Sequence, residues 1–85
     1  MAHTSQEELN QKIEEAKKKV EVGATYFHYK SLDQFYIVED IALMEETEEV
    51  CVVYKALYGD EITWVRTVEN FLKKTEHRPR FTKVE

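Results

Sequence analysis

Aromatic rings and basic side chains stand close together at three places in this chain. Six residues make up the set: His28, Tyr29, Lys30, Tyr58, Trp64 and Arg66. A ring offers a flat surface for stacking, and a neighbouring guanidinium or ammonium group attracts negative charge. We therefore predict that these residues form a ligand-binding face for a peptide or a single-stranded nucleic acid.

Catalysis is the competing chemistry, because an imidazole such as that of His28 exchanges a proton near pH 7. No serine or cysteine nucleophile stands in a recognisable frame, and Cys51 lies in an apolar segment where we expect a buried structural thiol. We predict a noncatalytic module without cofactor or metal. The alternative is an enzymatic or small-molecule-binding accessory domain that uses His28 and Arg66.

The acidic run Met44–Glu49 is the one segment rich in carboxylates that could suit a hard cation. It lacks the glycine and the aspartate spacing of a calcium-binding loop. We predict a solvated acidic connection.

The segment 50–66 predicts the hairpin that positions several of these side chains. Val50–Leu57 alternates apolar residues on both faces, as in a largely buried strand, and Ile62–Arg66 resumes the pattern. Between them, Gly59 stands where a reversal needs a positive φ.

Shorter elements are predicted on either side of the hairpin. Strands are expected at 25–30, at 35–43 and at 80–84, with a turn at Ser31–Gln34 and one helical turn that tucks Val68, Phe71 and Leu72 inward. This order predicts a mainly β (α+β) fold: a small SH3-like five-stranded barrel with an N-terminal helix. In so small a domain the rings are also candidates for the core: Tyr26, Phe27, Phe35, Tyr54, Trp64, Phe71 and Phe81.

We predict an amphipathic helix over residues 1–22 and the β domain over residues 23–85. Ser5 and Glu8 match a capping box, and Gly23 is the expected stop. One apolar stripe follows at helical spacing, formed by Leu9, Ile13, Ala16 and Val20. The helix is expected to cover an open end of the barrel; the alternative is a homodimer or adaptor surface through Leu9, Ile13 and Val20.

Size and charge limit the classes of function. A chain of 85 residues is one small domain, which disfavours a deep enzyme cleft. The net charge of −5 gives no long-range attraction for nucleic acid, although residues 73–85 hold five basic groups against two acidic ones. Without a membrane span or signal segment, and with one cysteine, the expected location is the cytoplasm.

Several segments together resemble a bacterial family catalogued as domain of unknown function 1653. The resemblance covers residues 23–85 and rests on Tyr26–Lys30, Val52–Gly59, Trp64–Arg66 and Arg80-Phe81. Two positions depart from the family pattern, which commonly has a histidine at Met44 and a proline at Thr67. The resemblance implies the barrel fold and no particular activity.

Overall fold

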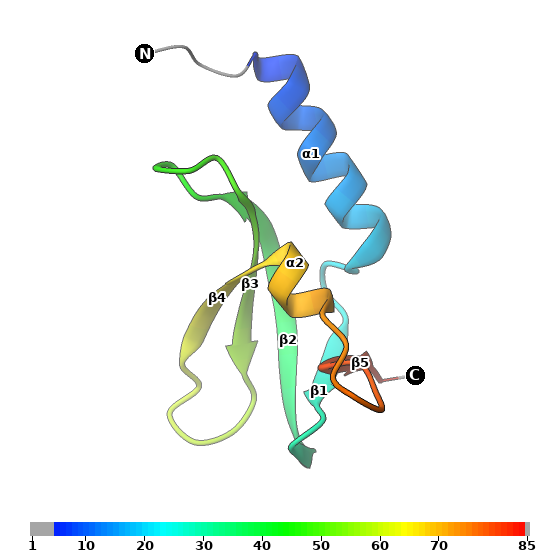
Figure 1. The fold of residues 1–85 in the computed structure, drawn as a ribbon. Coiled ribbons are helices and arrows are strands. Elements are labelled where there is room, and N and C mark those ends of the chain that lie inside the picture. The colour runs from blue at the N-terminus through cyan, green and yellow to red at the C-terminus, as the bar shows by residue number, and fades with distance from the viewer. Residues whose placement is uncertain (1–4, 85) are drawn as a thin grey trace.

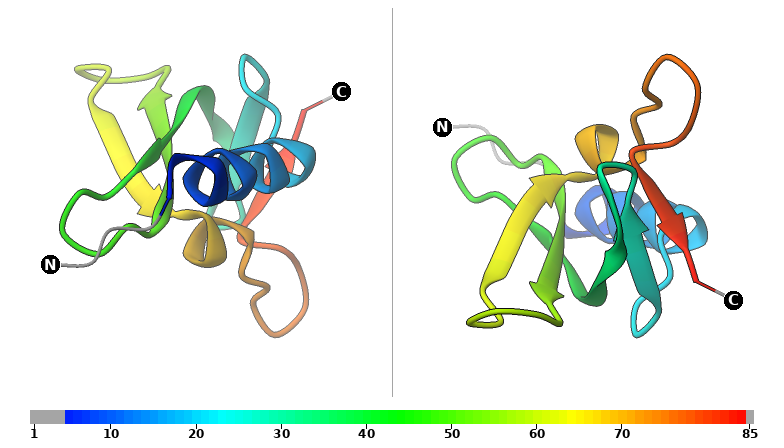
Figure 2. Two further views of the ribbon diagram at one scale, coloured as in Figure 1. Left: turned by 90° about the horizontal axis from the view of Figure 1, so that it is seen from above. Right: turned by 90° about the horizontal axis from the view of Figure 1, so that it is seen from below.

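A five-stranded antiparallel sheet with two helices on one side forms the protein, as a computed structural model describes it for residues 5–84. The elements are α1 (Gln6–Lys19), β1 (Thr25–His28), β2 (Ser31–Leu43), β3 (Val50–Ala56), β4 (Thr63–Thr67), α2 (Val68–Leu72) and β5 (Phe81–Lys83). The strand order is β4-β3-β2-β1-β5, and α1 lies across one end of the twisted sheet (Figures 1 and 2). The mainly β, α+β class is therefore confirmed.

The sheet is open in the described part of the chain. β4 and β5 are its two edges and do not pair with each other. Closure into an SH3-like barrel is therefore not confirmed. Within residues 5–84, no helix is both long and apolar enough to cross a membrane.

The cap at the start of α1 agrees with the sequence prediction. The Ser5 hydroxyl accepts a hydrogen bond from the Glu8 backbone N–H at 3.2 Å. The predicted stop at Gly23 is wrong, because α1 ends at Lys19 and the cap residue Val20 already has extended backbone. Gly23 instead has φ 90° in the turn that leads to β1, where its N–H donates to the Val38 carbonyl at 2.8 Å.

The first β-turn lies earlier than predicted. Ser31 already pairs with His28, so β2 begins at Ser31 and Tyr29-Lys30 forms the turn. The His28 ring supports this tight connection, because its Nδ1 accepts the Lys30 backbone N–H at 3.2 Å. β2 then runs for 13 residues, with a bulge between Val38 and Asp40 that breaks its register with β3.

The 50–66 hairpin is confirmed. β3 pairs with β4 from Cys51↔Thr67 to Lys55↔Thr63, and Gly59 has φ 58° in the turn. Glu61 also has a positive φ, 54°, which the sequence prediction missed. The predicted helical turn is α2: the Thr67 hydroxyl caps it by accepting the Asn70 N–H at 3.1 Å. Leu72 does not tuck inward but is exposed.

Directly paired residues share a face of the sheet, so the register separates core rings from exposed ones. We call the side that faces α1 and α2 the inner face; it carries Tyr26, Val38, Val52, Tyr54 and Phe81, all buried. α1 contributes Ala16 and Val20 to the same core. The helix and the sheet therefore share one hydrophobic core.

Three rings predicted as core candidates are not buried. Phe27 is half-buried and Phe35 is exposed, because they alternate with inner-face residues and point to the opposite, outer face. Trp64 pairs with Tyr54 on the inner face, yet it is 48% exposed because β4 is an edge strand with no neighbour beyond it. Burial of the other four is confirmed.

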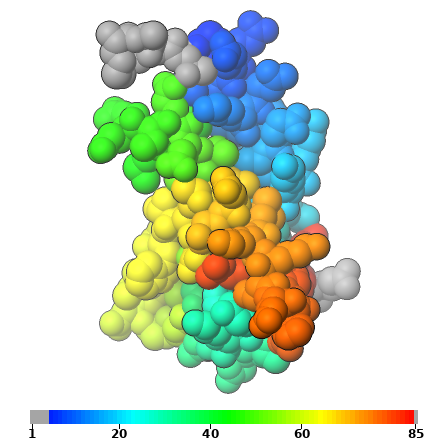
Figure 3. Space-filling view, viewed as in Figure 1, coloured from blue at the N-terminus to red at the C-terminus, as the bar shows by residue number. Residues whose placement is uncertain are grey.

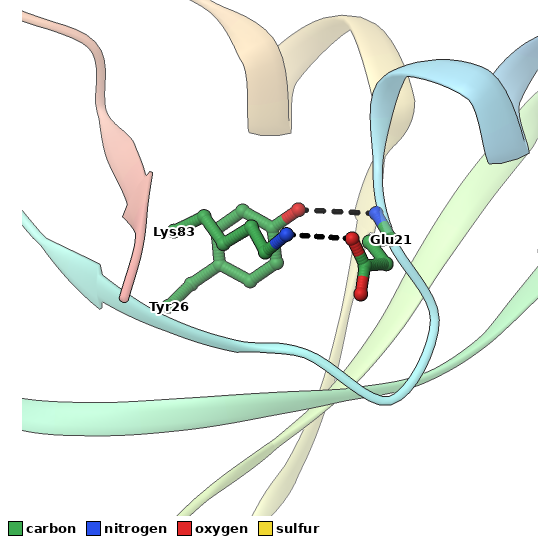
Figure 4. A network of polar contacts seen from close by, with 3 residues as sticks. All are labelled: Glu21, Tyr26 and Lys83. Atoms are coloured by element: carbon green, nitrogen blue, oxygen red, sulfur yellow. Dashed lines mark hydrogen bonds and ion pairs between the residues drawn. The ribbon is translucent and has the colours of Figure 1, made fainter. Parts of the chain in front are cut away.

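A polar contact ties the end of α1 to the far edge of the sheet. The Tyr26 hydroxyl accepts the Glu21 backbone N–H at 3.0 Å, and Lys83 Nζ lies 2.6 Å from Glu21 Oε1 (Figure 4). The space-filling view shows α1 (blue) beside the loop after β2 (green), where Lys12 donates to the Glu48 carbonyl (Figure 3). The helix is thus anchored through its C-terminal half.

Candidate functional site

Arg66 is held in a fixed position by three other elements. From β4, its Nε donates to the Tyr54 hydroxyl of β3 at 3.1 Å, and its Nη1 donates to Asn70 Oδ1 of α2. Its guanidinium carbon lies 5.5 Å from the centre of the Phe81 ring of β5, within cation–π range. Nη2 makes no hydrogen bond within residues 5–84, which leaves a planar donor available to an incoming acceptor.

The Phe81 ring beside this cation belongs to a larger aromatic cluster. Phe81 stacks on Phe71 at 4.3 Å between centroids and meets Tyr54 and Tyr36 edge-on at 5.5 and 5.8 Å. Such edge-to-face pairs fix ring orientation as well as burying apolar area. The cluster is therefore a rigid support for the groups at its border.

Tyr36 links this cluster to the exposed turn residue Tyr58. The two hydroxyl oxygens are 2.5 Å apart and the rings are edge-on at 5.5 Å. Desolvation is the largest cause that raises the pKa of Tyr36, and the hydrogen bond with Tyr58 is the second; together they raise it to about 12. The Tyr36 phenol is therefore protonated at neutral pH, and the pair of hydroxyl groups offers a donor and an acceptor.

His28 lies beside the same cluster on β1. Its ring is 5.0 Å from Phe81 and 4.7 Å from Tyr29. Desolvation, and then the charges of Arg66, Arg80 and Lys30, lower the pKa of His28 below 6.5. The ring is therefore neutral at pH 7; because Nδ1 accepts the Lys30 N–H, the proton is assigned to Nε2.

Arg80 adds a second guanidinium next to His28. Its carbonyl accepts the Tyr29 backbone N–H at 2.9 Å, which joins the start of β5 to the end of β1. The Arg80 Nε atom is buried without a hydrogen-bond partner among the described residues. Three cations thus gather at this site although the whole chain carries −5.

The structure brings together five of the six predicted site residues. His28, Tyr29, Lys30 and Arg66 act on one another through ring contacts and charge, and Tyr58 joins them through Tyr36. Trp64 shares the inner face but is in no ring pair within the described residues, so it stands at the border of the group.

Four residues of the site were missed by sequence reasoning: Tyr36, Asn70, Arg80 and Phe81. Alternation along the strands could have found Tyr36 and Phe81, since both lie on the same face as buried neighbours. No sequence signal pointed to Arg80, because it acts on His28 from a segment far away in the chain. Asn70 lies only four residues after Arg66, so this i, i+4 spacing was a local signal that the sequence reasoning did not use. Asn70 and the buried Phe81 support the site from behind, whereas Tyr36 and Arg80 join the six predicted residues. We call these eight residues the aromatic–basic face: His28, Tyr29, Lys30, Tyr36, Tyr58, Trp64, Arg66 and Arg80.

Catalysis at this face stays an untested alternative. Arg66 is bonded to the buried Tyr54 rather than to His28. Cys51 is buried as predicted, and desolvation raises the pKa of its thiol, which makes it a poor nucleophile at neutral pH.

The chain was compared with known families and structures. A family model described as "Protein of unknown function (DUF1653)" matches residues 24–83. The crystal structure of a protein of that family from Bordetella bronchiseptica is similar, with a TM-score of 0.62 and 31% sequence identity over 73% of this chain and 85% of that one. No curated protein matches the sequence.

Proposed function

This chain belongs to the DUF1653 family, and we propose from its own geometry that it is a noncatalytic binding module whose aromatic–basic face takes a single-stranded nucleic acid. A peptide that carries rings and carboxylates is the alternative ligand. The observation that supports the proposal most directly is Arg66, fixed by Tyr54 and Asn70 with Nη2 left for an acceptor. Because the guanidinium is pre-oriented, little side-chain entropy is lost when it binds a phosphate or carboxylate.

Exposed rings supply the second half of the proposed recognition. Trp64 is 48% and Tyr58 36% exposed, so each can stack on a base without unfolding the core. Together with Lys30, Arg66 and Arg80 they match the combination used for single strands, which is flat surfaces beside backbone-binding cations. At short range, the positive charge of these three side chains therefore outweighs the net negative charge of the whole chain.

The test is an amide chemical-shift and anisotropy titration with short oligothymidylate and oligouridylate strands, and in parallel with a mixed peptide pool. We expect shifts at the aromatic–basic face and a log–log salt slope of about −2, as three phosphate contacts would give. Shifts with peptides alone would make the ligand a peptide. Shifts with neither would contradict the proposal.

Substitution of Trp64 isolates the stacking contribution. Trp64→Ala should weaken oligonucleotide binding roughly fivefold or more, since one stacked base is worth about 1–3 kcal/mol. Val65→Ala is the matched control, because Val65 is similarly exposed on the same strand but points to the outer face. An equal loss in both variants would assign the effect to β4 as a whole and not to the ring.

A further inference from the structure

A second surface feature lies beside α1 and shares no residue with the aromatic–basic face. It is a groove of about 510 Å³ between α1, the start of β3 and the start of α2. Five glutamates line it: Glu8, Glu15, Glu48, Glu49 and Glu69. In Figure 1, α1 lies on the same side of the molecule as the loop that connects β2 to β3.

The floor of the groove is apolar while its rim is acidic. Ala16, Val50 and Val68 lie at its base, where the helix meets the sheet. The rim also carries two lysines, one of which, Lys12, donates to the Glu48 carbonyl at 3.2 Å. Five carboxylates against two ammonium groups leave this surface clearly negative.

The carboxylates do not converge on one point. Among the described residues, no group of three or more acidic, histidine or cysteine side chains is placed to hold a metal ion. The glutamate carboxylates are spread along the rim above an apolar floor. Such an arrangement suits a polypeptide with several separate Lys or Arg side chains better than one compact ion. The geometry of the rim therefore fits a basic polypeptide segment.

We propose that this groove binds a short basic amphipathic segment of a partner protein, with one apolar side chain on the floor and Lys or Arg side chains on the glutamates. Charge complementarity carries the choice of occupant, and the net charge of −5 attracts such a segment over distance. The groove needs α1, which lies outside the matched region 24–83. The proposed partner binding therefore depends on α1, which this chain has in addition to the matched region. It does not depend on the aromatic–basic face.

The test is a titration of the protein with a synthetic amphipathic peptide of Lys, Arg and Leu. Binding is measured by fluorescence anisotropy at low and at physiological salt, and the binding surface is located by amide chemical shifts. We expect saturable binding with shifts along α1 and at Val50 and Glu69. The double variant Glu15→Gln/Glu69→Gln should weaken binding roughly fivefold, as the loss of two rim ion pairs implies.

Glu45→Gln/Glu46→Gln is the matched control, because it removes the same charge from exposed loop residues that do not line the groove. Equal weakening by both double variants would show attraction by net charge alone and overturn the proposal, as would an absence of binding. Sedimentation of the free protein tests the other possible occupant, which is a second copy of this chain. Self-association that the groove variant abolishes, with no peptide binding, would make the occupant a second copy and also overturn the proposal.

Discussion

His28 shows how a few neighbours set the properties of one residue. Partial burial removes water from its ring, and Arg66, Arg80 and Lys30 place positive charge around it, so that protonation is disfavoured and the pKa falls. A neutral imidazole keeps Nε2–H as a donor and adds no positive charge to the three cations. In the proposed binding face, the residue would therefore act as a neutral donor at physiological pH.

The lowered pKa of His28 predicts how stability depends on pH. Below about pH 6.5 the unfolded chain takes up a proton at this residue while the folded chain still resists it, so the unfolded state holds more protons. The free energy of unfolding should therefore fall as the pH drops through 6.5 and level off below the folded-state pKa. Urea unfolding at pH 7.5 and 5.5 measures the loss.

His28→Gln should reduce that loss, and His77→Gln should not, because His77 is exposed on the loop before β5. If wild type and His28→Gln lose the same free energy of unfolding over this pH range, then carboxylates alone cause the pH dependence.

At the scale of elements, α1 is joined to the sheet by its C-terminal half. Val20 is fully buried, Ala16 is 3% exposed and Ile13 packs against the core, whereas Leu9 is only half-buried. The Glu21 contacts with Tyr26 and Lys83 hold the end of the helix in place. The dimer predicted through Leu9, Ile13 and Val20 stays untested, although Val20 is already buried within its own chain.

Val20→Ala should lower the free energy of unfolding by roughly 2 kcal/mol, because two buried methyl groups are lost and a cavity remains. Val22→Ala is the matched control: the same atoms are removed two residues later at a position that is 41% exposed, and we expect less than about 0.5 kcal/mol. Denaturant unfolding measures both. A similar small cost for the two variants would mean that α1 does not stabilise the sheet.

At the scale of the whole molecule, one aromatic cluster connects almost every element. Phe71 of α2 stacks on Phe81 of β5 and meets Tyr26 of β1 and Tyr54 of β3 edge-on at 5.4 and 5.6 Å. The same cluster supports Arg66. Because the sheet is open, β4 and β5 are not joined by strand hydrogen bonds, and the contact of Arg66 with Phe81 links these two edges instead.

Phe71→Ala should cost roughly 3–5 kcal/mol, since its side chain is 2% exposed and touches three other rings. That is a large share of the roughly 5–15 kcal/mol that stabilises a typical domain, so we expect partial or complete unfolding at 37 °C. Leu72→Ala, one residue later and 38% exposed, should cost no more than about 1 kcal/mol. Thermal unfolding by circular dichroism compares the two. A small effect of Phe71→Ala would contradict the central place of the cluster.

The sequence by itself determined the features that depend on neighbouring residues. The Ser5 cap, the Gly59 turn, the hairpin strands and the helical turn after β4 were all predicted, because each follows from backbone preferences and side-chain spacing within a few positions. Most of the aromatic–basic face was also identified from residue types alone. Residue types show which chemistry is present but not which groups meet.

Only the tertiary structure decided which groups meet. The pairing of β1 with β5 places Phe81 and Arg80 beside His28, and it also brings Phe81 next to Arg66 of β4. The tertiary structure also determines that Phe35 points to the outer face and that Trp64 is exposed on an edge strand. The physical reason is that burial depends on the order of strands and on what packs over them, and both arise from contacts between segments far apart in the chain.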